Sequence, residues 1–226
     1  MQGRGGIRIP PPGFLPRLRE LCDAHGALLI LDEIYTGFGR TGRWFACEHS
    51  GVAPDVICLG KALTGGFPLS ACVGRADLMD AAWPVSTGEA IHTSTFLGHP
   101  VGCVMALAQI REIARLDLVR RSERLGRRLL EMLQTAAREP ATLRKDEFRE
   151  SQTSSERARI RGTRGACASQ PPIQLAARGL GLMAGVELRN ADGSPATHAA
   201  LRVIKAMLQR GFILLPEGAD ANVISL

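Results

Sequence analysis

The fold is decided by the stretch Val56-Ile57-Cys58-Leu59-Gly60-Lys61, an apolar run that ends in a lysine. A second apolar run, at residues 27–31, ends in Asp32. Continuous apolar runs of this length are typical of strands in a parallel sheet that is covered on both faces. Both charged side chains would then stand at the carboxyl ends of strands, where ligands bind in open α/β sheets.

Lys61 and Asp32 together suit the chemistry of one cofactor. A lysine amine can form a Schiff base with the aldehyde of pyridoxal phosphate, and a carboxylate can keep the pyridine nitrogen protonated. The protonated ring accepts the electrons of a carbanion, and Lys61 would move the proton at the substrate α-carbon. A lone lysine after a strand is usually a solvated loop residue, so the interpretation depends on its pairing with Asp32.

Around these two runs, the sequence pattern predicts a larger α/β domain. Short apolar runs bounded by turn residues predict strands, and apolar residues at helical spacing predict helices. Strands that alternate with helices and loops indicate an α/β sheet. In this part of the chain we predict strands at 27–32, 55–60 and 68–74, and helices at 13–25, 101–113 and 118–138.

The sequence pattern of the last part of the chain predicts a smaller α+β unit. Residues 141–172 are polar and lack apolar periodicity, which predicts an irregular insertion. Regular structure is expected to resume with a strand at 180–188, a helix at 199–210 and a strand at 212–215. We therefore predict a sheet domain, connecting helices, a disordered insertion and a small terminal domain, with the boundaries 1–104, 105–140, 141–176 and 177–226.

Composition narrows the function classes. The net charge is +6, but the 28 Lys and Arg residues are scattered among acids without interleaved aromatics, so no nucleic-acid surface is predicted. No apolar run approaches the roughly 20 residues of a membrane span. The cysteines form no C-x-x-C pair and lie mostly in apolar context, which predicts reduced core residues of a cytoplasmic protein. They are Cys22, Cys47, Cys58, Cys72, Cys103 and Cys167.

Four motifs resemble, in order and spacing, those of the class III pyridoxal-phosphate aminotransferases. That family acts on ornithine, acetylornithine, 4-aminobutyrate and related amines. The first two motifs surround Asp32 and Lys61, and the others lie near the middle and in the last quarter of the chain. They read Asp32-Glu33-Ile34-Tyr35-Thr36-Gly37-Phe38-Gly39, Pro54-Asp55-Val56-Ile57-Cys58-Leu59-Gly60-Lys61-Ala62-Leu63, His92-Thr93-Ser94-Thr95-Phe96-Leu97-Gly98-His99-Pro100 and Arg178-Gly179-Leu180-Gly181-Leu182-Met183.

This resemblance implies a partial fold type I large domain with a mostly parallel sheet, followed by a small α+β domain. It implies a homodimer with shared active sites, binding pyridoxal phosphate and exchanging an amino group between an amine or amino acid and a 2-oxo acid. Lys61 would carry the cofactor, Asp32 would hold the ring nitrogen and Ile34 would pack on the back face of the ring. Thr95, with Ser94 beside it, would reach the phosphate of the partner's cofactor. No nucleic acid or membrane is expected as a partner.

Three positions depart from the family pattern. Tyr35 stands where many relatives have a glutamine that contacts the ring hydroxyl, and a phenol can still donate a hydrogen bond there. Many relatives have a glutamate at the position of Arg4 and an arginine at the position of Ser225, where the arginine binds the substrate carboxylate. Because a guanidinium suits a bidentate carboxylate contact, we expect Arg4 to take over that recognition.

Members of the family are roughly twice as long as this sequence, and Gln2-Gly3 matches a point within the large domain. The family's phosphate loop and stacking aromatic lie upstream of that point, so we expect the chain alone to have poor stability and little or no activity. One alternative is therefore an inactive remnant, or a gene-model fragment, that acts at most as a dimerisation partner. Another is a mutase or decarboxylase-type relative, because one fold supports several reactions. Residues 141–172 are either a genuine insertion or an error in the gene model.

Overall fold

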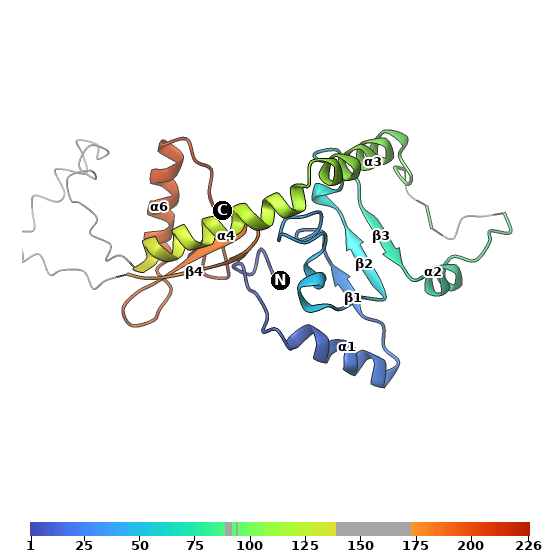
Figure 1. Ribbon diagram of the computed structural model, residues 1–226, viewed down its shortest axis with the longest axis horizontal. Coiled ribbons are helices and arrows are strands. Elements are labelled where there is room, and N and C mark those ends of the chain that lie inside the picture. The colour runs from blue at the N-terminus through green and yellow to red at the C-terminus, as the bar shows by residue number, and fades with distance from the viewer. Residues whose placement is uncertain (89–91, 94, 139–172) are drawn as a thin grey trace, which may run out of the picture.

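The chain forms two sheet units that are joined by a long helix, as the computed structural model shows in Figure 1. The structure describes residues 1–88, 92–93, 95–138 and 173–226. The predicted insertion at 141–172 lies outside the described residues. Within the described residues, no helix is long and apolar enough to cross a bilayer.

The first unit is built on a three-stranded sheet with the order β1-β2-β3. The pairing of β1 with β2 is parallel, and that of β2 with β3 is antiparallel. Each strand is shorter than predicted, and β1 begins at Ile30 rather than at Ala27. The elements of this unit are α1 (Phe14–His25), β1 (Ile30–Asp32), η1 (Ala46–Ser50), β2 (Val56–Leu59), η2 (Lys61–Leu63), β3 (Ala71–Gly74), α2 (Ala76–Ala82) and α3 (Pro100–Arg115).

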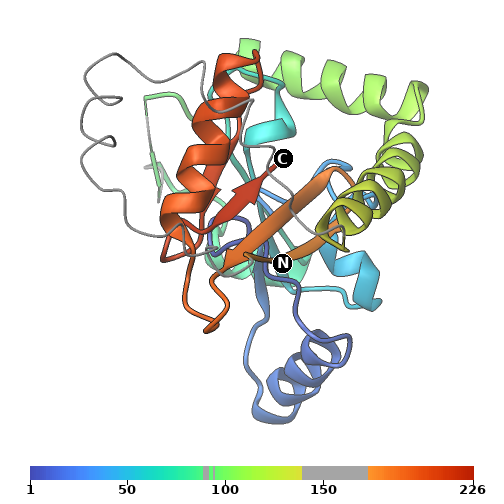
Figure 2. The same cartoon turned by 90° about the vertical axis from the view of Figure 1, so that its left-hand side faces the viewer.

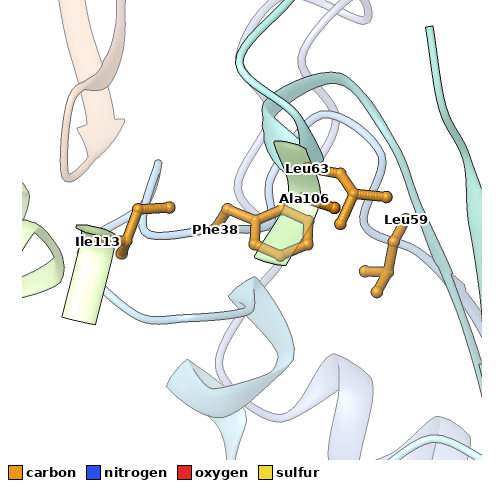
Figure 3. Packing of buried hydrophobic residues seen from close by; sticks show 5 residues of the cluster. All are labelled: Phe38, Leu59, Leu63, Ala106 and Ile113. Atoms are coloured by element: carbon orange, nitrogen blue, oxygen red, sulfur yellow. The ribbon is translucent and has the colours of Figure 1, made fainter. Parts of the chain in front are cut away.

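The core of this unit lies between β2, η2 and α3. Leu59 and Leu63 meet Ala106 and Ile113 of α3, and Phe38 fills the space between them (Figure 3). The Phe38 ring also contacts Phe45 edge to face, with the ring centroids 5.8 Å apart. One face of the sheet is therefore covered by α3 and by the loop that follows β1.

The opposite face of the sheet is open, contrary to the prediction that both faces are covered. Ile30 is 58% exposed and Leu28, just before β1, is 50% exposed. The prediction that the cysteines are core residues is also wrong for two of them, since Cys72 and Cys103 are exposed. The apolar runs were sufficient to predict strands, but the sequence does not show what packs against each face.

The second unit is a four-stranded antiparallel sheet with the order β4-β5-β7-β6. Figure 2 shows α6 lying against these strands. A core cluster made by Leu188, Ala196, Ala200 and Ile224 joins the helix to the sheet. The elements are β4 (Gln174–Leu180), β5 (Met183–Arg189), α6 (Thr197–Gln209), β6 (Leu215–Glu217) and β7 (Val223–Ser225).

Two strand predictions for this unit were wrong. The single strand expected at 180–188 is a hairpin, because Gly181 has φ of +56° and turns the chain between β4 and β5. The strand expected at 212–215 begins only at Leu215 and continues as β6. The helices predicted at 101–113, 118–138 and 199–210 are confirmed as α3, α4 (Leu118–Arg138) and α6.

The two units meet where α4 crosses the β4–β5 hairpin. A Cβ atom added to Gly126 of α4 would overlap the backbone of Gly181, so the two chains touch backbone to backbone. Arg40 O accepts hydrogen bonds from Leu182 N at 3.0 Å and from the Ser122 hydroxyl at 3.3 Å. This contact fixes the second unit against the loop that follows β1.

Asp55, at the start of β2, ties together three elements of the first unit. Its carboxylate accepts hydrogen bonds from Leu29 N at 2.8 Å, from Arg19 of α1 at 2.6 Å and from Arg75 after β3 at 3.0 Å. The Leu29 N–H and then the Arg19 guanidinium lower the pKa of Asp55 from its ordinary 3.8 to about 2. The carboxylate stabilises the folded chain only while it is ionised.

We expect Asp55→Asn to lower the thermal unfolding midpoint at neutral pH, because it leaves two guanidinium groups facing a neutral amide. Since the folded-state pKa is lowered, this stabilisation is present above the ordinary value and is lost between about pH 5 and pH 2. The midpoints of the wild-type chain and the variant should therefore converge as the pH falls through that window. Asp80→Asn, at an exposed position on α2, is the control. A difference that stays constant down to pH 2 would contradict this account.

Candidate functional site

Lys61 begins η2, separated from the end of β2 by Gly60, in a strained backbone conformation. Its φ of +38° is uncommon for a residue with a side chain, and such strain is found preferentially at functional sites. Its Nζ lies 4.8 Å from the centroid of the Tyr35 ring, which is a cation–π contact worth about 0.5–1 kcal/mol at an exposed site. Lys61 itself is exposed. The amine is thus held at the edge of the sheet while remaining open to solvent.

Asp32 lies at the same edge, at the end of the neighbouring parallel strand. Its register partner on β2 is Cys58, and its Oδ1 accepts a hydrogen bond from Ile34 N at 2.9 Å. Among the described residues, no protein donor reaches its Oδ2. The Ile34 side chain packs on Gly60, where an added Cβ would lie 3.2 Å from Ile34 Cγ2. The turn after β1 therefore rests directly on the residue before Lys61.

Tyr35 joins the two sheet units at this point. Its ring lies under the Lys61 amine and packs with a small cluster formed by Ile7, Met183 and Val223. A Cβ on Gly3 would come within 2.5 Å of the ring, so this approach requires a glycine. The ring thus separates Lys61 from the second unit. It is held by the Lys61 amine on one side and by Gly3 and Met183 on the other.

Glu33 has a structural role that sequence analysis missed. Its buried carboxylate accepts hydrogen bonds from Cys47 N at 2.8 Å, from Ala46 N at 3.0 Å and from the Thr36 hydroxyl. Burial, and then the charge of Glu33, raises the pKa of the Cys47 thiol to about 11. These bonds close the loop that carries Ile34 and Tyr35. An acid next to Asp32 in the sequence gave no signal of partners that lie more than ten residues away.

Arg4 pairs with Glu217, which the sequence analysis also missed. The distance from Nη1 to Glu217 Oε1 is 3.3 Å; the Glu217 side chain is 2% exposed and that of Arg4 is 78% exposed. The backbone of Arg4 is held by Gly218, whose N donates to Arg4 O at 3.1 Å. Ser225 is buried, and its hydroxyl donates to Leu215 O at 3.4 Å. The guanidinium group of Arg4 is therefore largely exposed to solvent, while its Nη1 pairs with the buried Glu217.

The third motif leads into α3, and part of it is described. Thr95 is exposed in the segment before α3, and Ser94 lies outside the described residues. His99 caps α3 by accepting a hydrogen bond from Gly102 N at 3.5 Å, as expected of a histidine in a polar loop. No group of three metal-ligating side chains occurs within the described ranges. The structure thus brings together Asp32, Ile34, Tyr35 and Lys61.

Comparisons with known proteins agree with these motifs. A sequence model described as Aminotransferase class-III matches residues 1–146. A transaminase from the marine bacterium Virgibacillus is 31% identical with a TM-score of 0.75, and the match covers 100% of this chain and 45% of that one. An ornithine aminotransferase from Toxoplasma gondii ME49 is 32% identical with a TM-score of 0.72, covering 100% of this chain and 44% of that one. An acetylornithine aminotransferase from Elizabethkingia anophelis is 30% identical with a TM-score of 0.70, and the match covers 100% of this chain and 46% of that one. The chain therefore spans less than half the length of these structures.

Proposed function

Because the chain belongs to the class-III aminotransferase family, we propose that it contributes the lysine-bearing part of a pyridoxal-phosphate transaminase site. The reaction is the exchange of an amino group between an amine or amino acid and a 2-oxo acid. The proposed assembly is a cytoplasmic homodimer with shared sites. The similarity of the chain to transaminases over its whole length supports this proposal.

The residues at the sheet edge fit this cofactor. Lys61 offers a solvent-open amine at the end of β2, and Asp32 offers a carboxylate whose Oδ2 has no protein donor among the described residues. Pyridoxal phosphate, when bound, supplies a ring that accepts the electrons of a carbanion. Lys61 would hold the cofactor and move the proton at the substrate α-carbon, and Asp32 would keep a proton on the ring nitrogen.

The other residues of the site would position these two groups. Ile34, fixed against Gly60, would present its methyl groups to one face of the ring. Tyr35 occupies the place between Lys61 and the second unit, from which its hydroxyl would donate a hydrogen bond to a ring oxygen. Ser94 and Thr95 would serve the phosphate bound by the partner subunit, and the exposure of Thr95 supports this.

The observation that carries the proposal is the placement of Lys61 and Asp32 at the same edge of adjacent parallel strands, with Lys61 at a φ of +38°. In a full-length protein that joins this chain to the family's upstream phosphate loop, we expect amino transfer from an ω-amino acid to a 2-oxo acid to depend on added pyridoxal phosphate. Asp32→Asn should slow the transfer by about 10²–10⁴-fold, the range for loss of a positioned proton-holding group. Asp80→Asn, on the exposed surface of α2, is the matched control. Equal rates for the two variants would contradict the role of Asp32.

We also propose that Arg4 binds the carboxylate of the substrate, since its fork is exposed and bonded to Glu217 through one nitrogen. In the same full-length protein, Arg4→Ala should raise KM for a dicarboxylic 2-oxo acid and leave KM for a substrate without the second carboxylate unchanged. Arg17→Ala, at another exposed arginine that pairs with an acid, should change neither value. An unchanged KM for both substrates in Arg4→Ala would refute the role of Arg4.

A further inference from the structure

Cys58 and Cys72 face each other across the antiparallel pair of β2 and β3. The carbonyl of Cys58 accepts a hydrogen bond from Glu33 N at 2.9 Å, so the backbone polar groups of Cys58 point toward β1 and away from β3. Cys58 and Cys72 are therefore a non-hydrogen-bonded pair, in which the Cα atoms lie about 4.5 Å apart and the side chains are closest. This separation lies within the range of about 4.4–6.8 Å seen in disulfides.

Both thiols stand on the open face of the sheet. Their neighbours Leu59 and Ala71 belong to the core on the opposite face, and successive side chains of a strand point to opposite faces. Cys72 is exposed and Cys58 is partly buried. Burial, followed by the charges of Cys72 and Asp32, raises the pKa of the Cys58 thiol. A reagent in solution would therefore react first with the exposed Cys72. Cys58, which is less accessible and has a raised pKa, would remain protonated until the second step.

We infer that Cys58 and Cys72 are a redox-active dithiol that a small-molecule disulfide, such as oxidised glutathione, converts into a cross-strand disulfide. Cys72, as its thiolate, attacks one sulfur of the reagent and releases the first small thiol. Cys58 then loses its proton to water and attacks Cys72 Sγ, which releases the second small thiol. One S–S bond forms in the protein as the S–S bond of the reagent breaks. The two electrons that reduce the reagent come from the two cysteine sulfurs.

The disulfide would enclose the segment that carries Lys61, the lysine of the proposed site. The ring closed by the disulfide contains Lys61 and the glycine turn at Gly65 and Gly66. Asp32 is the register partner of Cys58 on the other side of β2. The bond would therefore fix both ends of the segment that carries Lys61. The chemistry itself requires neither the cofactor nor the proposed transamination, so it can be tested independently of both.

The test treats the purified chain with oxidised glutathione, blocks the remaining thiols, and digests without reductant with trypsin and a protease that cleaves after glutamate. Cleavage after Lys61 separates the peptide of Cys58 from the peptide of Cys72, and cleavage after Glu48 removes Cys47 from the former. We expect mass spectrometry to find these two peptides joined and to see them separate on reduction. The same treatment in denaturant should give a mixture of pairings.

Two variants define the order of events and one serves as the matched control. Cys58→Ser should leave a lasting glutathione adduct on Cys72, and Cys72→Ser should abolish the link without an adduct on Cys58. Cys103→Ser removes another exposed cysteine and should leave the link intact. The inference is overturned if wild-type Cys72 keeps its glutathione, joins Cys72 of a second chain, or stays unmodified. It is also overturned if the link forms no more readily in the folded chain than in denaturant.

Discussion

Replacing Lys61 by alanine is expected to abolish the covalent attachment of pyridoxal phosphate to the chain and, in the full-length protein, to lower the rate of amino transfer by about 10²–10⁴-fold. The amine is the only proposed point of covalent attachment, and it is also the group that would move the proton at the substrate α-carbon. The loss should appear in the absorbance of the bound cofactor as well as in the transfer rate.

The matched control for this variant is Lys205→Ala. Lys205 is an exposed lysine on α6, in the second unit, whereas Asp32, Ile34 and Tyr35 belong to the first unit. Its removal should leave cofactor absorbance and transfer rate unchanged, so that a general loss of positive charge is excluded as the cause. If the two lysine variants behave alike, Lys61 has no special role.

Gly126→Ala is expected to destabilise the chain by about 3 kcal/mol or more in the free energy of unfolding, at the upper end of the cost of overpacking. Alanine normally favours a helix over glycine by about 1 kcal/mol, so helix propensity alone predicts the opposite sign. The structure reverses that sign because the added Cβ would overlap the backbone of Gly181 in the β4–β5 turn. Backbone atoms in a tight turn cannot move aside as a flexible side chain can.

Chemical denaturation of the variant, compared with Gly13→Ala, provides the measurement. Gly13 lies at the start of α1, and a Cβ added there would meet no atom within 4 Å. Gly13→Ala should therefore cost about 1 kcal/mol or less, the part due to alanine being a poorer N-cap than glycine. A Gly126→Ala variant as stable as the wild-type chain would show that α4 and the hairpin do not touch as described.

The sequence predicted the helices and the ends of the first two strands well, because those features depend on local patterns. Apolar residues spaced three and four positions apart predict α3 and α4. Apolar runs that end in a charged residue predict the sheet edge where Asp32 and Lys61 lie. The predicted fold class, a partial fold type I large domain followed by a small α+β domain, was implied by the family resemblance and is confirmed by the two sheets and by the similarity to solved transaminases. These conclusions needed no knowledge of contacts between distant residues.

The features that sequence analysis missed are contacts across space. Glu33, Asp55 and Glu217 are buried acids whose partners come from other elements, and a single acidic residue gives no sign of them. The β4–β5 hairpin was read as one strand because its turn consists only of Gly181 and Leu182. The exposure of Cys72 depends on which face of the sheet is covered, and an apolar run does not specify that.

The open face also gives a physical reason for the expected low stability of the chain alone. On this face Ile30 is 58% exposed and Leu28 is 50% exposed, and exposed apolar surface of this kind marks contact sites or a tendency to associate. The proposed homodimer would require such contacts. The thiol pair lies on this same face, so any partner that covers the face would also control access to Cys72.

The most direct test of the central claim is to locate the cofactor on the chain. The protein is mixed with pyridoxal phosphate, reduced with borohydride, digested and mapped by mass spectrometry, with Lys205→Ala and Lys61→Ala treated in parallel. We predict that the reduced cofactor is found on Lys61 in the wild-type chain and in Lys205→Ala, and that Lys61→Ala takes up none. Label spread over Lys205 and other amines, or retained in Lys61→Ala, would contradict the assignment of Lys61 as the cofactor lysine.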